Sequence, residues 1–221
     1  MPKAPRTQDE IQQIRDHILE EAIRLITEKG FNNLSMRSIA AGVGMTAANI
    51  YNYYKNKDEL YLDIQTRGFE QLHEYLRQAL NENPDPRQGI SAVMRAYIAF
   101  GLSFPSLYEI MFILNTPKYA DYRHTALEPI AFLEKETALK AARLLVEAIE
   151  GISPELSLVP PEDAFFRMTQ VWTALHGIVS LYNSRVLQEV EEDTRAFINR
   201  SIKTYSRFFI RDAEQQKGDA S

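Results

Sequence analysis

Apolar side chains recur three or four positions apart along most of the chain, which is the spacing of one buried face of an α-helix. Between residues 11 and 30, for example, the positions on this face are Ile11, Ile14, Ile18, Ala22, Leu25 and Ile26. No stretch shows the strict alternation of apolar and polar residues that is typical of a half-buried strand. The pattern therefore predicts an all-α fold with about nine helices.

The pattern shortens between residues 34 and 53, where it predicts two short helices joined by a tight turn. Ser35 can cap the first helix, because its hydroxyl can accept a hydrogen bond from the exposed amides of the first turn. Gly44 follows where the chain must turn sharply, since glycine reaches positive φ at little steric cost. Thr46 can cap the second helix. This is the layout of a helix-turn-helix, whose second helix enters the major groove of DNA.

The residues of these two helices, with the run that follows them, form a specific signature. It comprises Ile39-Ala40, Val43-Gly44, Thr46, Ile50-Tyr51, Tyr53-Tyr54-Lys55, Lys57 and Asp58-Glu59-Leu60. The set closely resembles the N-terminal domain of the TetR family of bacterial transcriptional regulators over residues 11 to 71. Ala47 departs from the family pattern, because many members carry lysine there as a phosphate contact.

The resemblance implies that this head binds double-stranded DNA as a homodimer, on an operator that is roughly palindromic. The residues at the start of the second helix are expected to contact base edges in the major groove. The asparagines among them can pair with adenine. The expected base contacts are Ala47, Ala48, Asn49 and Asn52. The expected phosphate contacts and groove-flanking residues are Arg37, Thr46, Tyr51, Lys55 and Lys57. By spacing, Ile50, Tyr54 and Leu60 are expected in the core.

The resemblance, together with the composition of the two ends, divides the chain into four expected parts. They are a disordered arm over residues 1–10, a helix-turn-helix domain over 11–71, a regulatory and dimerisation domain over 72–212 and a disordered tail over 213–221. In the arm, Lys3 and Arg6 either reach a minor groove, as some N-terminal arms do, or belong to a plain solvated tail. A fourth helix should begin near residue 58. In the family this helix links the head to the rest, so it is the expected carrier of any switch.

The expected C-terminal domain carries bulky aromatic and flexible side chains at helical spacing. Two of its segments, Trp172-x-x-x-His176-Gly177 and Pro105 to Phe112, resemble one TetR subgroup. Members of the family usually hold an effector pocket there, and small-molecule sites are mostly apolar with a few polar groups. The candidate pocket residues are Tyr97, Phe100, Phe104, Tyr108, Met111, Phe112, Trp172 and His176. The alternative is an ordinary core, since such a stripe is more often just packed.

The last two long helices are expected over residues 162–187 and 193–211. The resemblance implies that these helices of two protomers form a four-helix bundle at the dimer interface. The expected interface residues are Val179, Tyr182, Val186, Ile198, Ile202, Tyr205 and Phe209. The alternative is that the same residues form intramolecular core.

The net charge of −5 is unusual for a protein that binds phosphates, but the charge is unevenly distributed. Residues 1–57 hold eight Lys or Arg against six Asp or Glu, a net of +2, so the remaining residues carry −7. A positive face on an acidic body can still dock on DNA. So few positive charges per protomer favour binding as a dimer.

No motif of a common enzyme class is present in the sequence. It has no Gly-rich phosphate loop, no His-Glu-x-x-His, no Gly-x-Ser-x-Gly and no dinucleotide fingerprint. The four histidines lack the pairing of helical metal ligands, and there is no cysteine. No apolar run approaches the roughly 18 residues of a membrane span, and the first ten residues lack the apolar core expected of a signal peptide. We therefore expect a cytoplasmic protein with no enzyme activity, metal, cofactor or membrane partner.

These features predict a sequence-specific DNA-binding transcriptional regulator, most simply a dimeric repressor released by a small apolar or amphipathic ligand. Such a ligand would shift the fourth helix and need only bind one spacing of the two heads better than the other. Two alternatives stay open: a ligand-independent DNA-binding protein, and a helical small-molecule enzyme or carrier with a relict head. The sequence does not specify the effector, the operator, the target genes or the sign of regulation.

Overall fold

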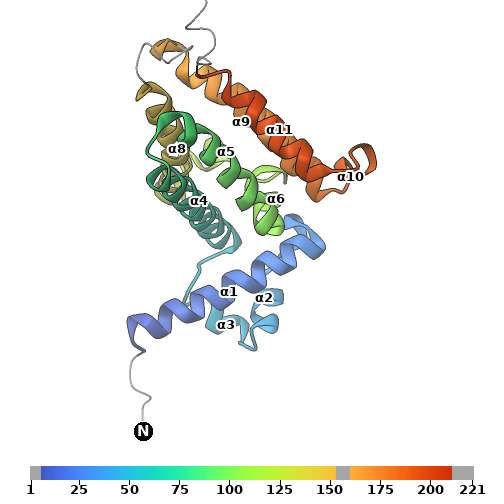
Figure 1. The fold of residues 1–221 in the computed structure, drawn as a ribbon. Coiled ribbons are helices and arrows are strands. Elements are labelled where there is room, and N and C mark those ends of the chain that lie inside the picture. Colours follow the sequence, from blue (N-terminus) through green and yellow to red (C-terminus); the bar gives the residue numbers. More distant parts are fainter. Residues whose placement is uncertain (1–5, 153–159, 211–221) are drawn as a thin grey trace, which may run out of the picture. The chain divides into compact units, whose positions relative to one another are not determined.

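A computed structural model describes residues 6–152 and 160–210, and over these residues the fold is all-α without a strand, which confirms the predicted fold class (Figure 1). The α-helices are α1 (Gln8–Lys29), α2 (Met36–Gly42), α3 (Ala47–Ile50), α4 (Lys57–Glu82), α5 (Pro86–Ser103), α6 (Pro105–Phe112), α7 (Tyr119–Tyr122), α8 (Glu128–Glu150), α9 (Ala164–Asn183), α10 (Leu187–Val190) and α11 (Thr194–Ser206). Two 3₁₀ turns are η1 (Phe31–Asn33) and η2 (Pro161–Asp163). The sequence did not predict α7 and α10, because a single turn is too short to show a period.

The chain divides into two compact units. The first, called the head unit, comprises residues 1–69 and 106–137; the second, called the C-terminal unit, comprises 70–105 and 138–221. Helices α4 and α8 each contribute one half to either unit. Of the stretches expected to be disordered, residues 1–5 and the tail 213–221 lie outside the described residues.

The head unit contains α1, α2, α3 and the first half of α4, and its helix ends follow local sequence signals (Figure 1). Helix α1 begins with a capping box, in which the Thr7 hydroxyl accepts from the amide of Glu10. For this reason the helix starts inside the stretch expected to be an arm. It ends at Gly30, whose φ of 79° favours glycine. A second capping box, between Ser35 and Ser38, opens α2.

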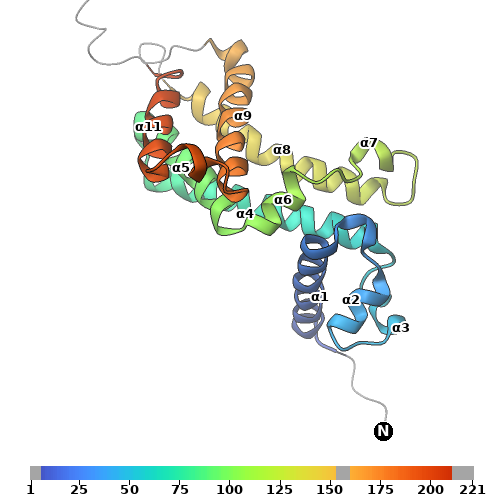
Figure 2. The same cartoon turned by 90° about the vertical axis from the view of Figure 1, so that its right-hand side faces the viewer.

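The core of the head unit joins the apolar faces of α1, α2 and α4. Its fully buried members include Ile18, Ala22, Ile39, Ile50, Leu60 and Ile110. Ile110 comes from α6, a segment that the sequence assigned to the C-terminal domain. Figure 2 shows α7 beside the beginning of α8, where Tyr122 and Ala131 form a smaller cluster with Leu62. The head unit therefore contains more chain than the helix-turn-helix region that was expected.

In the C-terminal unit, α5 packs against both α9 and α11 (Figures 1 and 2). The Tyr75 ring on the second half of α4 meets Phe100 of α5 and Phe104, the residue that caps this helix, edge to face, with ring centroids 5.7 and 6.0 Å apart. Phe100 is fully buried. Apolar contacts between helices therefore hold the interior of this unit together.

Among the described residues, no single helix combines the length and the hydropathy of a membrane span, and only the bent pair α5 and α6 has both the length and the composition.

Candidate DNA-binding interface and ligand cavity

The recognition segment consists of α3 and the turn that follows it. Gly44, at φ 68°, makes the turn between α2 and α3. The Thr46 hydroxyl then accepts from the amide of Asn49 at 3.2 Å and caps α3. Ile50 and Tyr54 are buried beneath the segment, at 0% and 1% exposure. These anchors leave the opposite side of α3 in solvent.

All nine residues expected to contact or flank DNA reach the surface of the head unit. Arg37, Thr46, Ala48, Asn49, Tyr51, Asn52 and Lys55 are exposed, and Ala47 and Lys57 are half-buried. The side-chain Nδ2 of Asn52 donates to Oδ1 of Asn49 at 3.3 Å. This bond holds the two base-reading candidates side by side. The Nζ of Lys57 lies 4.8 Å from the centre of the Phe31 ring. Lys57 is therefore partly engaged within its own head.

Arg6 contributes a contact at this surface that the sequence did not predict. Its guanidinium hydrogen-bonds to the Tyr53 hydroxyl and lies 6.0 Å from the centre of that ring. The sequence left Arg6 between a minor-groove arm and a solvated tail, whereas Lys3 lies outside the described residues. A contact across 47 positions of chain leaves no trace in local periodicity.

Behind the recognition segment, polar side chains of the head unit form a network. The Tyr54 hydroxyl donates to Asp63 on α4 at 2.6 Å, and Arg15 on α1 donates to the same carboxylate at 3.1 Å. Arg67 donates to Asp63 and also pairs with Asp16. Burial and the bond to Asp63 raise the pKa of Tyr54, so its hydroxyl remains a donor at neutral pH. The sequence offered no signal for this network beyond the charges themselves.

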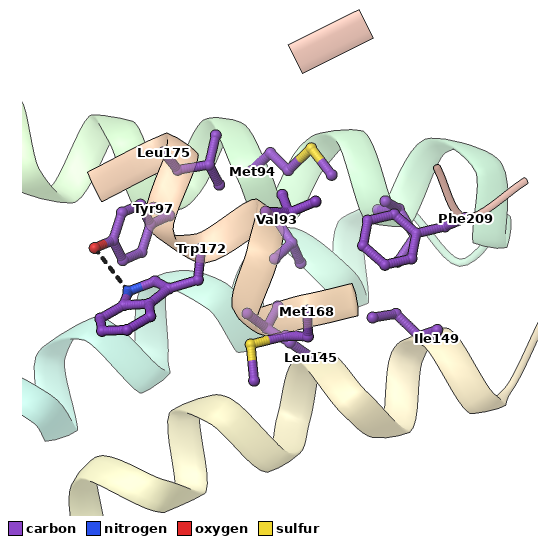
Figure 3. A pocket seen from close by; sticks show the side chains of 11 residues that line it. Val93, Met94, Tyr97, Leu145, Ile149, Met168, Trp172, Leu175 and Phe209 are labelled. Atoms are coloured by element: carbon purple, nitrogen blue, oxygen red, sulfur yellow. Dashed lines mark hydrogen bonds between the residues drawn. The ribbon is translucent and has the colours of Figure 1, made fainter. Parts of the chain in front are cut away.

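A small apolar cavity of about 30 Å³ lies in the C-terminal unit (Figure 3). It is lined by Ile90, Val93, Met94, Tyr97, Leu145, Ile149, Met168, Val171, Trp172, Leu175 and Phe209. Figure 3 shows the indole Nε1 of Trp172 donating to the Tyr97 hydroxyl, at 3.0 Å. None of the eleven lining side chains carries a charge. The cavity offers an apolar environment with one polar pair at its wall.

The structure places the candidate pocket residues in three settings. Tyr97 and Trp172 line the cavity, and the His176 ring lies 6.0 Å from the Trp172 ring. Burial lowers the pKa of His176, which favours its neutral form at pH 7. Phe100 and Phe104 pack with each other and with Tyr75. The other three, Tyr108, Met111 and Phe112, belong to the head unit.

The seven residues expected at a dimer interface differ in burial. Val179, Ile202 and Phe209 are buried inside their own chain, at 0 to 2% exposure, which is the intramolecular alternative. Tyr182, Ile198 and Tyr205 are half-buried, and Val186 is exposed. Among the described residues of the C-terminal unit, the exposed large apolar side chains that the sequence did not assign to the interface are Phe165, Phe166, Leu181, Val190 and Phe208. Helix α9 is apolar on nearly all sides, so its period could not indicate which face is core.

Metal-ligating side chains do not gather in the part of the chain that the structure describes. There, no group of three or more His, Cys, Asp or Glu is arranged to hold a metal ion.

Comparisons with known proteins address the family of this chain. Residues 18–64 match the bacterial regulatory proteins of the tetR family, and residues 90–205, more than half of the chain, match the tetracyclin repressor-like C-terminal domain. The HTH-type transcriptional regulator AcrR of Shigella flexneri is 38% identical over 61 residues, 28% of each chain. The HTH-type transcriptional activator FasR of Mycolicibacterium smegmatis is 26% identical over 149 residues, 63% of this chain and 68% of FasR. A tetR-family regulatory protein from Rhodococcus RHA1 has a TM-score of 0.67 at 18% identity, over 90% of this chain and 98% of that chain.

The two matched regions together account for both the capped recognition helix and the helical region that follows. Regulators of this family bind DNA and act as dimers. The matches point to a regulator rather than an enzyme. The chain belongs to the TetR family and is a helix-turn-helix, DNA-binding transcriptional regulator.

Proposed function

We propose that the protein is a homodimeric repressor, active in the cytoplasm, that leaves a palindromic operator when a small apolar or amphipathic ligand enters the C-terminal unit. The observation that carries the proposal is the uncharged cavity between α5, α8 and α9. Repression is supported by the match to repressor-like C-terminal domains. FasR, however, is an activator. A promoter-reporter assay with and without the protein decides the sign.

The lining determines which ligands fit. A charged group buried among uncharged side chains would lack a partner and be costly. The cavity is smaller than the roughly 150 Å³ that admits benzene, so a ligand must displace side chains to enter. Met94 and Met168 are suited to this, since methionine is flexible and adapts to irregular spaces.

Helix α4 offers a route from this cavity towards the head. It is one continuous helix from Lys57 to Glu82, and its Tyr75 packs on Phe100 of α5 and on Phe104 at the end of α5. Helix α5 also supplies several cavity-lining residues. Widening the cavity can therefore move α5 and, through Tyr75, the helix that begins in the head.

The outward face of α9 supports dimerisation through this helix. Phe166, Thr173 and Leu181 are exposed at intervals of seven and eight residues, and half-buried Gly177 lies between them. Apart from its chain neighbours and the adjacent backbone of α9 itself, a methyl group added at Gly177 would meet nothing within 4 Å. Its own chain therefore does not require glycine here, whereas a closely approaching partner helix would.

Leu181→Asp tests this face by placing a charge within it. We expect the variant to be monomeric in sedimentation equilibrium and to lose operator affinity, because one head carries few positive charges. Leu133→Asp, at an exposed leucine of α8, is the matched control and should stay dimeric. A dimeric Leu181→Asp protein would show that α9 does not form the interface.

Selection of bound sequences from random duplexes, at fixed moderate salt, tests the DNA-binding part of the proposal. We expect one palindromic motif, with half-sites about 34 Å or a multiple apart. If the protein bound duplexes in a salt-sensitive way but selected no motif, the proposal of sequence-specific binding would be wrong.

The single tryptophan of the chain allows a direct test for a ligand, because Trp172 lines the cavity. Apolar compounds that enter should change its fluorescence and, in the same titration range, release the operator. The small cavity volume favours one alternative, a ligand-independent regulator. That alternative is supported if compounds alter the fluorescence but leave operator binding unchanged.

A further inference from the structure

The recognition helix cannot hold its own orientation. Helix α3 is a single turn, Ala47–Ile50, and isolated helices shorter than roughly 12 to 15 residues are marginal in water. Contacts from outside α3 must therefore set its direction. Tyr54 supplies one of them, since it follows α3 closely and is buried in the head core. The residue that binds Tyr54 consequently influences where α3 points.

Asp63 on α4 binds Tyr54 and collects donors from two further sources. Its Oδ2 accepts from the Tyr54 hydroxyl at 2.6 Å and from Arg15 Nη2 of α1 at 3.1 Å. Its Oδ1 accepts from Arg67 Nε, one turn further along α4, at 3.2 Å. The Arg15 guanidinium also lies 4.5 Å from the centre of the Tyr54 ring. One carboxylate thus joins α1, α4 and the segment that follows the recognition helix.

The chemistry of this cluster requires a carboxylate. All three partners of Asp63 are donors, and an ionised carboxylate accepts on both oxygens. An asparagine would place two amide hydrogens where one oxygen now accepts, so at least one contact would become donor against donor. The Asp63 side chain is only 21% exposed, so water replaces a lost partner poorly.

We propose that Asp63 is a positioning residue for DNA binding, which acts through Tyr54 to hold the recognition helix in the orientation that fits the major groove. Asp63 acts through Tyr54 and makes no DNA contact of its own, since a carboxylate next to a phosphate would be repelled. The proposal concerns binding without any effector and is independent of the ligand cavity.

Three variants separate positioning from general stabilisation. Asp63→Asn removes the charge and retains the shape, and Tyr54→Phe removes only the hydroxyl. Asp16→Asn is the matched control, because Asp16 also pairs with Arg67 and carries the same charge in the head, but its hydrogen bonds go to Gln12 and Arg67. Circular dichroism melting identifies a temperature at which every variant is fully folded.

Affinities are then measured by fluorescence anisotropy on the selected palindromic duplex and on a scrambled duplex of equal length and composition. We expect Asp63→Asn and Tyr54→Phe each to bind the palindrome about tenfold more weakly, and the scrambled duplex no more weakly than the parent protein does. Asp16→Asn should stay within about twofold of the parent protein on both. Loss of a negative charge by itself favours binding to phosphates, so weaker binding of Asp63→Asn has the opposite sign to a general charge effect.

Hydrogen exchange of amides 47–54 in the free protein gives a second readout that needs no operator. Exchange should be faster in Asp63→Asn and Tyr54→Phe and unchanged in Asp16→Asn. The proposal is overturned if Tyr54→Phe leaves both affinity and exchange unchanged, or if Asp16→Asn loses as much affinity as Asp63→Asn. If Asp63→Asn does not fold, the comparison of operator affinity and amide exchange between Tyr54→Phe and Asp16→Asn decides whether the proposal holds.

Discussion

The head unit and the C-terminal unit are both helical, but different interactions position their functional residues. In the head, directional polar contacts set the geometry: the Thr46 cap, the Asn49–Asn52 pair and the donors around Asp63. In the C-terminal unit, eleven uncharged side chains enclose a cavity with one hydrogen-bonded pair, Tyr97 and Trp172. Apolar burial is non-directional. The difference suits a head that reads one DNA surface and a second unit whose interior can adapt to a ligand.

The largest effect should come from removing a fully buried ring of the C-terminal unit, Phe100→Ala. We expect the free energy of unfolding to fall by about 3–5 kcal/mol, because a cavity would be left beside Tyr75 and Phe104. Urea denaturation followed by circular dichroism measures this loss. Val190→Ala, at a side chain of the same unit that is 73% exposed, should cost at most about 0.5 kcal/mol. Equal losses in both variants would show that apolar burial does not dominate this unit.

A base-reading residue of the head provides the next prediction. Asn49→Ala should weaken operator binding by about 1–3 kcal/mol and relax the preference at one base position. Repeating the duplex selection with this variant measures both. Asn81→Ala, at an exposed asparagine near the end of α4, is the control and should retain the parent motif. An unchanged motif with Asn49→Ala would remove this residue from base recognition.

Lys55→Ala tests the non-specific part of head binding. The exposed lysine is expected at phosphate, so its loss should weaken binding to every duplex and lower the salt slope by about 1. Anisotropy titrations at several salt concentrations give that slope. Lys140→Ala, on the exposed surface of α8, should leave it unchanged. If Lys55→Ala altered sequence preference instead, our separation of base and phosphate contacts would fail.

Tyr97→Phe probes the hydrogen bond between Tyr97 and Trp172 at the cavity wall. The variant removes the acceptor of the Trp172 indole, and we expect a cost of about 1 kcal/mol in unfolding free energy. The fluorescence of Trp172 should shift as its environment changes, whereas operator affinity without ligand should not. A larger loss of operator affinity than of stability would show that this wall is tied directly to the head.

His176 should give the smallest effect, and it appears as a dependence on pH. Burial lowers the pKa of His176 in the folded protein, so the unfolded chain binds the proton more readily. The stability that neutral His176 contributes to the folded state is fully present above the ordinary pKa of about 6.5. It is lost as the pH falls below that value. Unfolding curves from pH 7.5 to about 5 should therefore show a decline that is weaker in His176→Gln. The same slope in both proteins would assign the decline to other groups.

Several features were predictable because the signals are local. The caps at Ser35 and Thr46, the turn at Gly44 and the burial of Ile50 and Tyr54 follow from residues within one or two turns. The family resemblance rests on the same short run and is confirmed. The contacts that anchor this run were not predictable, since Arg15 lies 48 positions from Asp63.

The C-terminal unit shows why periodicity alone is insufficient. A helical period indicates that a face is apolar but not which element covers it. On α9 nearly every face is apolar, so the sequence could not separate buried Val179 from exposed Leu181. Nor could it predict that Phe209, beyond the end of α11, would line a cavity with Val93 of α5.

The sequence by itself determined the all-α fold, the helix-turn-helix and its capped recognition helix, because each depends on residues that are close along the chain. Tertiary structure decided that α6 joins the head core, that Asp63 pairs with Arg15 of α1 and which side chains surround the cavity. These features arise where distant segments meet. Their partners are selected by the packing of whole helices, which a local pattern of polar and apolar residues does not encode.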